Sequence, residues 1–197
     1  MRFSNDDGDE VTNETAPALR RRRWFRLRGG LCRDESGATA VEFSLIALPF
    51  IALLGAILES AIVFLASQVL DTATADAARL IRTGQAQEAK YQSGDFKTQV
   101  CKRLYVLFDC NKVAVESTVF GSFSSISNTP PLNGSGNFDS TKVVNFQMGG
   151  ASEIVVVRVY YEWPLFFNKL GFNLANTANG KRLLTGVASF RNEPFPW

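Results

Sequence analysis

The chain has 197 residues, of which 46% are hydrophobic and 12% aromatic, enough for one ordinary domain plus a membrane anchor. Its formal net charge of +2 gives no support for nucleic-acid binding. It contains no histidine, so the commonest general base and the commonest metal ligand of proteins are both excluded.

The positive charge of the N-terminal region lies in seven arginines between residues 20 and 33, a stretch without any acid. Residues 1–19 are polar and acidic without periodicity and are predicted to be disordered. The arginines could bind nucleic acid, form a solvated tail, or hold the N-terminus in the cytoplasm. We favour the third interpretation, because an apolar run follows closely and positive charge before a span fixes that end inside.

That apolar run predicts a membrane anchor over residues 38–66. From Phe43 to Leu58 the only polar side chain is Ser44, and a spanning helix needs about 20 mostly apolar residues. The helical pattern continues over 67–84, where apolar residues recur every three or four positions. They are Ala66, Val69, Leu70, Ala73, Ala77, Leu80 and Ile81. We expect this face to pack on the chain's own globular domain, with partner helices as the alternative.

Two residues interrupt the pattern of the anchor. Glu59 is expected at the far membrane interface, where its carboxylate can reach water, and pairing with another subunit is the alternative. Pro49 removes a backbone hydrogen bond and is expected to kink or loosen one helical turn. A removed secretory signal is the alternative for the anchor region. It would need a short apolar core with a small-residue cleavage site after it, and this apolar run is too long.

The remaining residues, 85–197, predict an extracytoplasmic α+β domain. Asp95 can cap a helix over 95–108, and alternating side chains predict a strand over 112–120. Residues 121–141 are rich in Ser, Asn, Gly and Pro and are expected to form a long loop. Further strands are predicted at 153–163, ended by Pro164, and at 183–191. The expected architecture is a long N-terminal helix, a short helix and three or four antiparallel strands.

The most informative stretch is the ten residues from Gly37 to Ile46, which place Glu42 at the cytoplasmic mouth of the apolar run. A carboxylate at the edge of a bilayer costs several kcal/mol and is usually functional. A glycine, a carboxylate five residues later, upstream arginines and a downstream apolar run together resemble the processing site of type IV pilin-like proteins. The Glu42-Phe43 pair, the segment 76–84 and the terminal Arg191-Asn192-Glu193-Pro194 are similar to TadE-like pseudopilins of the Tad (tight adherence) system.

The resemblance implies a non-enzymatic pseudopilin for adhesion and biofilm formation, anchored by one span in a bacterial inner membrane with its C-terminal domain in the periplasm. A prepilin peptidase would cut between Gly37 and Ala38, which removes a leader of residues 1–37. Glu42 and Phe43 would act in assembly, where Glu42 pairs with the N-terminus of an adjacent subunit. The implied partners are that peptidase, other pilins, the Tad inner-membrane assembly platform and membrane lipid, with no nucleic acid. An uncleaved single-span periplasmic binding or adhesive protein is the alternative.

Cys101 and Cys110 are the two cysteines expected outside the cytoplasm, where disulfides persist, so we predict that they pair. A helix that continued unbroken to Phe108 would hold them too far apart, so pairing requires the helix to end early or the chain to fold back. Their spacing is unlike that of metal ligands. We find no nucleophile with a base, so we expect no enzyme activity, metal or cofactor. A secretion-pathway enzyme would need a base that the sequence does not offer.

Overall fold

A computed structural model describes residues 35–104, 107–166 and 172–196. The chain divides into two compact units, Met1–Ile46 and Ala47–Trp197. The described part of the first unit consists of the opening turns of helix α1, which extends over Glu35–Arg82. The Arg cluster and Cys32 lie outside the described residues.

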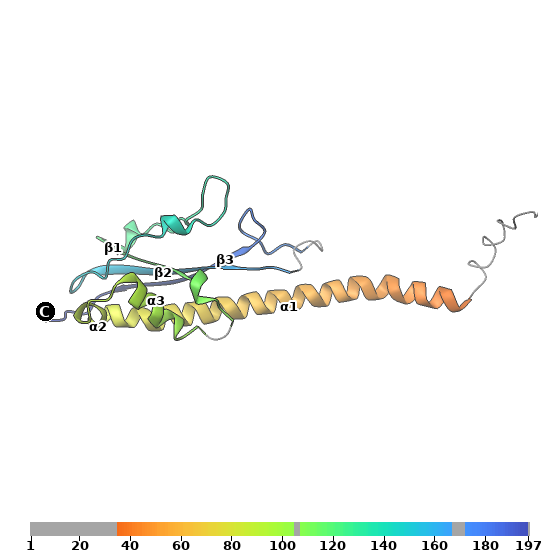
Figure 1. Ribbon diagram of the computed structural model, residues 1–197, viewed down its shortest axis with the longest axis horizontal. Helices are drawn as coiled ribbons and strands as arrows, with labels where there is room; N and C mark the ends of the chain where they lie inside the picture. Colours follow the sequence, from red (N-terminus) through yellow and green to blue (C-terminus); the bar gives the residue numbers. More distant parts are fainter. Residues whose placement is uncertain (1–34, 105–106, 167–171, 197) are drawn as a thin grey trace, which may run out of the picture. The chain divides into compact units, whose positions relative to one another are not determined.

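The second unit holds the rest of α1, two further helices and a three-stranded sheet, and so confirms the expected α+β class (Figure 1). After α1 come the helices α2 (Gln85–Glu88) and α3 (Ser93–Cys101). The strands are β1 (Ala114–Phe120), β2 (Ile154–Trp163) and β3 (Arg182–Arg191), and all neighbours are antiparallel in the order β1-β2-β3. Short 3₁₀ turns occur at Cys110–Lys112, Phe123–Ser125 and Ser140–Lys142.

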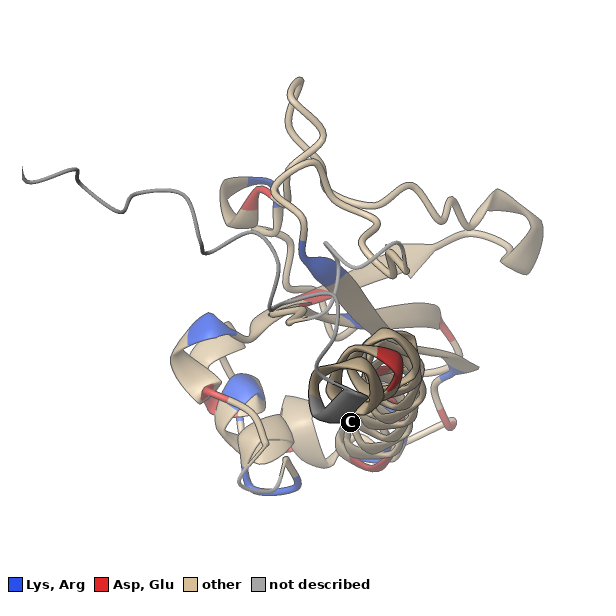
Figure 2. Ribbon diagram, turned by 90° about the vertical axis from the view of Figure 1, so that its right-hand side faces the viewer, with Lys and Arg blue, Asp and Glu red and all other residues tan. Residues whose placement is uncertain are grey.

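Helices α1 and α3 cover one face of this sheet, and the connection after β1 lies over the other face (Figures 1 and 2). The central strand β2 is therefore buried on both sides, and its sequence reads as a nearly continuous apolar run. The outer edge of β1 is covered by residues 145–147. There the backbone N–H of Ser117 donates to the Asn145 carbonyl (3.0 Å), and the Ser117 carbonyl accepts from the backbone N–H of Gln147 (2.8 Å). Covering that edge leaves fewer free backbone groups for unwanted pairing with other chains.

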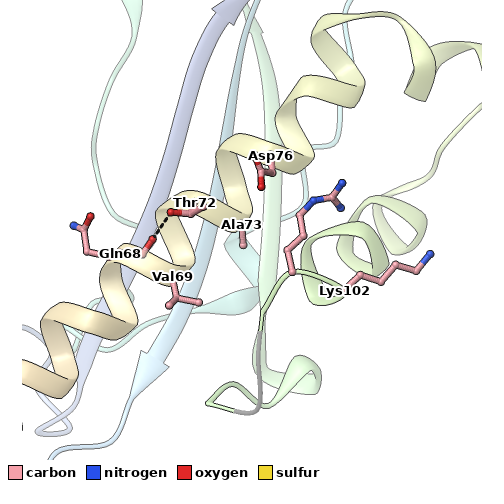
Figure 3. A pocket seen from close by; sticks show the side chains of 7 residues that line it. Gln68, Val69, Thr72, Ala73, Asp76 and Lys102 are labelled. Carbon is pink, nitrogen blue, oxygen red and sulfur yellow. Dashed lines mark hydrogen bonds between the residues drawn. The ribbon is translucent and has the colours of Figure 1, made fainter.

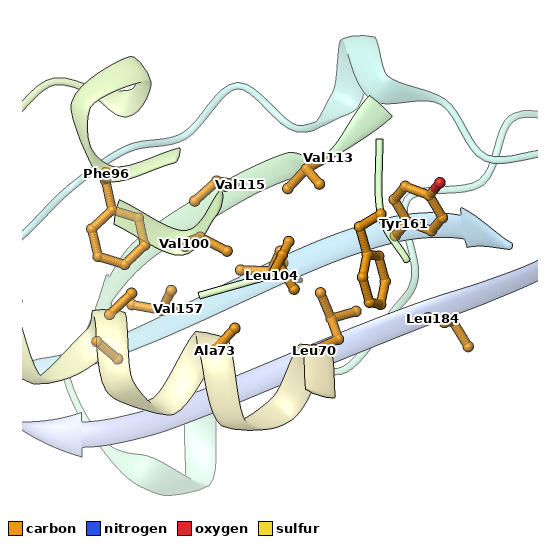
Figure 4. Close-up of a cluster of buried hydrophobic side chains, with 14 of the residues drawn as sticks. Leu70, Ala73, Phe96, Val100, Leu104, Val113, Val115, Val157, Tyr161 and Leu184 are labelled. Carbon is orange, nitrogen blue, oxygen red and sulfur yellow. The ribbon is translucent and has the colours of Figure 1, made fainter. Parts of the chain in front are cut away.

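The hydrophobic core lies between α1, α3 and the facing side of the sheet (Figure 4). The buried face of α1 includes Ala66, Leu70, Ala73, Ala77 and Ile81, as the apolar spacing predicted. From α3 come Phe96 and Val100, and from the sheet alternate residues of β1 and β2. Small alanines on α1 allow the helix to approach the sheet closely, so large side chains from the other elements fill the remaining space.

The opposite face of the sheet carries a buried polar cluster that sequence patterning did not predict. Arg158 on β2 is 6% exposed, lies 3.8 Å from the Glu116 carboxylate on β1, and donates to the Ser127 carbonyl in the loop above. The Tyr160 hydroxyl donates to the same Glu116 carboxylate at 3.2 Å. A buried guanidinium has to be paired, so this cluster ties the 121–141 loop to the sheet.

Two predicted elements differ from the structure. The helix expected over 95–108 extends only over Ser93–Cys101. Asp95 is the third residue of this helix and caps its start, because its carboxylate accepts a hydrogen bond from the backbone N–H of Gln92 (2.9 Å). The predicted helix was too long because apolar residues continue past Cys101. Phe108 is one of them, and it packs in the core edge-on against Tyr161 and Trp163 although it lies outside the helix. The other difference is at the start of α1, which includes Gly37 within its first turn.

Candidate assembly site on the N-terminal helix

The opening turns of α1 carry the residues that were expected to act in processing and assembly. Gly37 and Ala38 are exposed, and a Cβ added at Gly37 would meet nothing within 4 Å. Both residues are helical, whereas a peptidase needs an extended backbone. The first turn of a helix has unsatisfied N–H groups and contains a poor helix former here, so it unwinds at little cost.

Glu42 and Phe43 follow on the same exposed segment, with Phe43 73% exposed. Among the described residues, Glu42 makes no side-chain hydrogen bond or ion pair. The sequence has no Lys or Arg between Ala38 and Ala78, so the counter-charge does not come from the helix itself. The nearby Ser44 hydroxyl bonds to its own helix at the Val41 carbonyl (2.8 Å). Glu42 therefore has the exposure needed to meet a charge on another molecule.

Large apolar side chains cover the exposed surface of α1 as far as Leu65. Within the part of the chain that the structure describes, Gly37–Arg82 is one helix long and apolar enough to cross a membrane. The exposed fractions include 72% at Leu48, 62% at Leu58 and 67% at Phe64. So continuous an apolar surface is unfavourable in water, and it suits contact with lipid or with other apolar helices.

Glu59 does not reach water as expected. Its side chain is buried, with 5% of the residue exposed, and its carboxylate accepts a hydrogen bond from the backbone N–H of Phe166. Phe166 follows β2 after Pro164, more than a hundred residues along the chain. This contact could not be predicted from the sequence, because no local pattern in α1 or in residues 164–166 indicates that they pair.

The structure joins Cys101 and Cys110 through a disulfide, with their Cα atoms 5.9 Å apart. Helix α3 ends at Cys101, which is the early end that pairing required. The Asp109 carboxylate then turns the chain by accepting from the Asn111 backbone at 3.0 Å. That hydrogen bond, together with Lys112 nearby, lowers the pKa of Asp109 below its usual value.

The terminal Arg-Asn-Glu segment has a structural role at the end of α1 that its sequence signal did not specify. Asn192 is 3% exposed, and its side-chain amide donates to the Met148 and Gly150 carbonyls at 3.0 and 2.9 Å. The Glu193 backbone donates to the Arg82 carbonyl at 2.9 Å, which satisfies one of the free carbonyls at the helix C-terminus. Gly84, in the left-handed region at φ 81°, ends the helix as predicted.

A groove lies beside α1 (Figure 3). It has a volume of about 310 Å³ and lies between α1 and the turn after α3, with Asp76 on one wall and Lys102 and Arg103 on the other. It brings together no nucleophile and base. Among the described residues no group of three His, Cys, Asp or Glu side chains could hold a metal ion.

Comparison with known proteins gives one informative finding. The family model described as TadE-like protein matches residues 37–79, a segment that holds Gly37, Ala38, Glu42 and Phe43 and most of α1. No curated protein and no solved structure matches the chain. TadE-like proteins are structural pseudopilins, and their family implies pilin or pilus-assembly partners in general. The chain is thus similar to TadE-like proteins over most of its long apolar N-terminal helix.

Proposed function

We propose that this protein is a non-enzymatic, membrane-anchored pseudopilin that is needed to assemble a Tad-type pilus or to make it work in adhesion and biofilm formation. The observation that carries the proposal is the dual character of α1. One stretch exposes large apolar side chains such as Leu48 and Leu58, and the next stretch buries Leu70 and Ile81 in the globular core. A single helix thus provides both a lipid-compatible surface and a rigid attachment to the domain.

The proposed topology puts the N-terminus in the cytoplasm of a bacterium and the C-terminal domain in the periplasm. Support comes from the arginines that precede the apolar run, since positive charge marks the cytoplasmic side. We divide the chain into a leader at 1–37, an anchor at 38–66, a helical continuation at 67–84 and a domain at 85–197. A prepilin peptidase then acts at the cytoplasmic face, between Gly37 and Ala38.

Cleavage supplies the missing partner for Glu42. A cut after Gly37 leaves an ammonium on Ala38, about 6 Å along the helix from Glu42. Both charges are costly in a medium of low dielectric and attract strongly there. Pairing between the carboxylate of one subunit and the ammonium of the next removes this cost, and it gives assembly a fixed register. The other pilins and the inner-membrane assembly platform of the Tad system are the proposed partners.

Substitution of Glu42 tests this function. Glu42→Gln keeps the size and hydrogen bonding of the side chain and removes its charge, so the variant should be cleaved, inserted and folded like the parent. It should fail to crosslink to other pilins in the membrane, and the cells should form fewer pili and adhere less. Glu42→Asp keeps the charge and serves as the matched control, with crosslinking expected to be largely retained.

Parental crosslinking and adhesion in the Glu42→Gln strain would remove the assembly role. Glu42 would then be only a carboxylate at the cytoplasmic interface.

A further inference from the structure

The segment that follows β2 lies beside the apolar part of α1, not beside its polar part. Figure 1 shows β2 running toward the N-terminal part of the helix within the second unit. The backbone N–H of Phe166 bonds to the Glu59 carboxylate, which fixes the level of this segment along α1. Leu165 packs on the core, whereas Pro164 is exposed and Phe166 is 80% exposed. A core-anchored segment thus presents an aromatic ring outward at the level of Glu59.

The exposed surface of α1 changes character only beyond this level. Phe64 and Leu65 are still 67% and 53% exposed, and the next exposed side chains are Gln68, Asp71 and Thr72. The apolar belt of the helix therefore ends after Leu65, which lies about 9 Å past Glu59 at the helical rise per residue. If α1 spans a membrane up to the end of this belt, Phe166 lies inside the outer leaflet.

We propose that the segment from Pro164 to Phe166 is a membrane-docking surface whose partner is the lipid of the outer leaflet. This inference rests on the proposed membrane span of α1. It explains two features together. Glu59 is a carboxylate within the apolar belt, and the bond from the Phe166 backbone compensates its burial away from water. The Phe166 ring is exposed at the level of Glu59, where Leu58 and Ile62 on α1 are exposed as well, and a Phe side chain is favourable in the apolar part of a bilayer.

The docking surface would give the domain a second attachment to the bilayer beside the span. An aromatic ring seated in lipid about 1.7 helical turns from the end of the apolar belt restricts how the domain tilts about α1.

A fluorescent depth measurement on the full chain tests the proposal. The chain, with Cys32→Ser to remove the leader thiol, is given a single new cysteine at Phe166, labelled with an NBD dye and placed in nanodiscs of phosphatidylethanolamine and phosphatidylglycerol. Leu58→Cys, 62% exposed on α1, marks lipid depth, and Phe123→Cys, 53% exposed in the loop after β1, marks water. Iodide quenches dyes in water, and doxyl-labelled lipid quenches dyes in the acyl region.

The dye at residue 166 should behave like the dye at residue 58, with iodide quenching several-fold weaker than at residue 123 and strong quenching by doxyl lipid. Adding Glu59→Ala, which removes the acceptor for the Phe166 N–H, should increase iodide quenching of the residue-166 dye. Iodide quenching at 166 equal to that at 123, with residue 58 still in lipid, would overturn the docking surface and leave the span intact. A residue-166 dye shielded from both quenchers would also overturn it, in favour of a protein contact. A residue-58 dye in water would overturn the span and the docking surface with it.

Discussion

At the scale of single residues, β3 packs closely against α1 at Gly186. A Cβ added at Gly186 would meet the Thr74 hydroxyl and come within 3.0 Å of the Leu70 carbonyl. Thr74 is fully buried, and its hydroxyl is held by a hydrogen bond of 2.7 Å to that same carbonyl. Neither neighbour can move away, so glycine is required at this position by space and not by backbone conformation.

Gly186→Ala should therefore destabilise the protein by about 1–3 kcal/mol, the usual cost of overpacking a core. Chemical unfolding of the full chain in detergent, followed by near-UV circular dichroism, measures the change. Gly121→Ala is the matched control, because a Cβ there meets nothing within 4 Å. Equal unfolding midpoints for the two variants would show that α1 and β3 do not pack this closely. Thr74→Ala added to Gly186→Ala should restore part of the loss, since it removes the nearest atom.

The buried polar cluster on the other face of the sheet makes a pH-dependent contribution. Burial, and next the negative charge of Glu116, raise the pKa of Tyr160 from 10.0 to about 12. The folded state thus keeps this phenol neutral where the unfolded state ionises it. Stability from Tyr160 is fully present below pH 10 and is lost as the pH rises toward 12. Urea midpoints measured between pH 9 and 12 should fall more steeply in the parent than in Tyr160→Phe, and parallel curves would contradict this assignment.

At the scale of elements, the Cys101–Cys110 disulfide closes the chain between α3 and β1. The closed loop contains Leu104 and Phe108, which are both buried in the core, and Lys102 and Arg103, which line the groove beside α1. The disulfide thereby holds the irregular segment after α3 in a position that helix propensity alone would not give it.

Oxidised, denatured protein should show one free thiol, that of Cys32, before processing and none after it. Cys101→Ser should lower the free energy of unfolding by about 2–3 kcal/mol, which is the chain-entropy value for a loop of ten residues. Cys32→Ser should leave it unchanged. Two additional thiols in the oxidised protein would contradict the disulfide.

The elements that sequence predicted well have strong periodicity of their own. The buried face of α1 followed from apolar residues three and four apart, and β2 from its run of valines. The end of α3 was missed because Phe108 continues the apolar stripe while packing on Tyr161 and Trp163 from outside a helix. The Glu59–Phe166 and Asn192–Met148 contacts were missed for another reason. Each joins polar groups distant in sequence, and no local pattern encodes such a pairing.

At the scale of the whole molecule, the candidate site combines residues of different predictability. Gly37 and Glu42 could be singled out from sequence because a carboxylate beside a long apolar run has no other explanation in its surroundings. Their proposed function depends on a partner charge, and the sequence holds no Lys or Arg between Ala38 and Ala78 that could supply it. The proposed assembly role thus depends on processing, because cleavage creates the ammonium that Glu42 is proposed to meet.

The intact mass of the protein extracted from membranes of cells with an active prepilin peptidase tests that step most directly. The mature chain should begin at Ala38, and Gly37→Leu should leave the leader attached, whereas Gly30→Leu, in the leader, should still be cleaved. A side chain at position 37 would obstruct the approach of the backbone to the peptidase. A parental chain that still begins at Met1 in those cells would rule out cleavage after Gly37 and would leave an uncleaved, single-span protein.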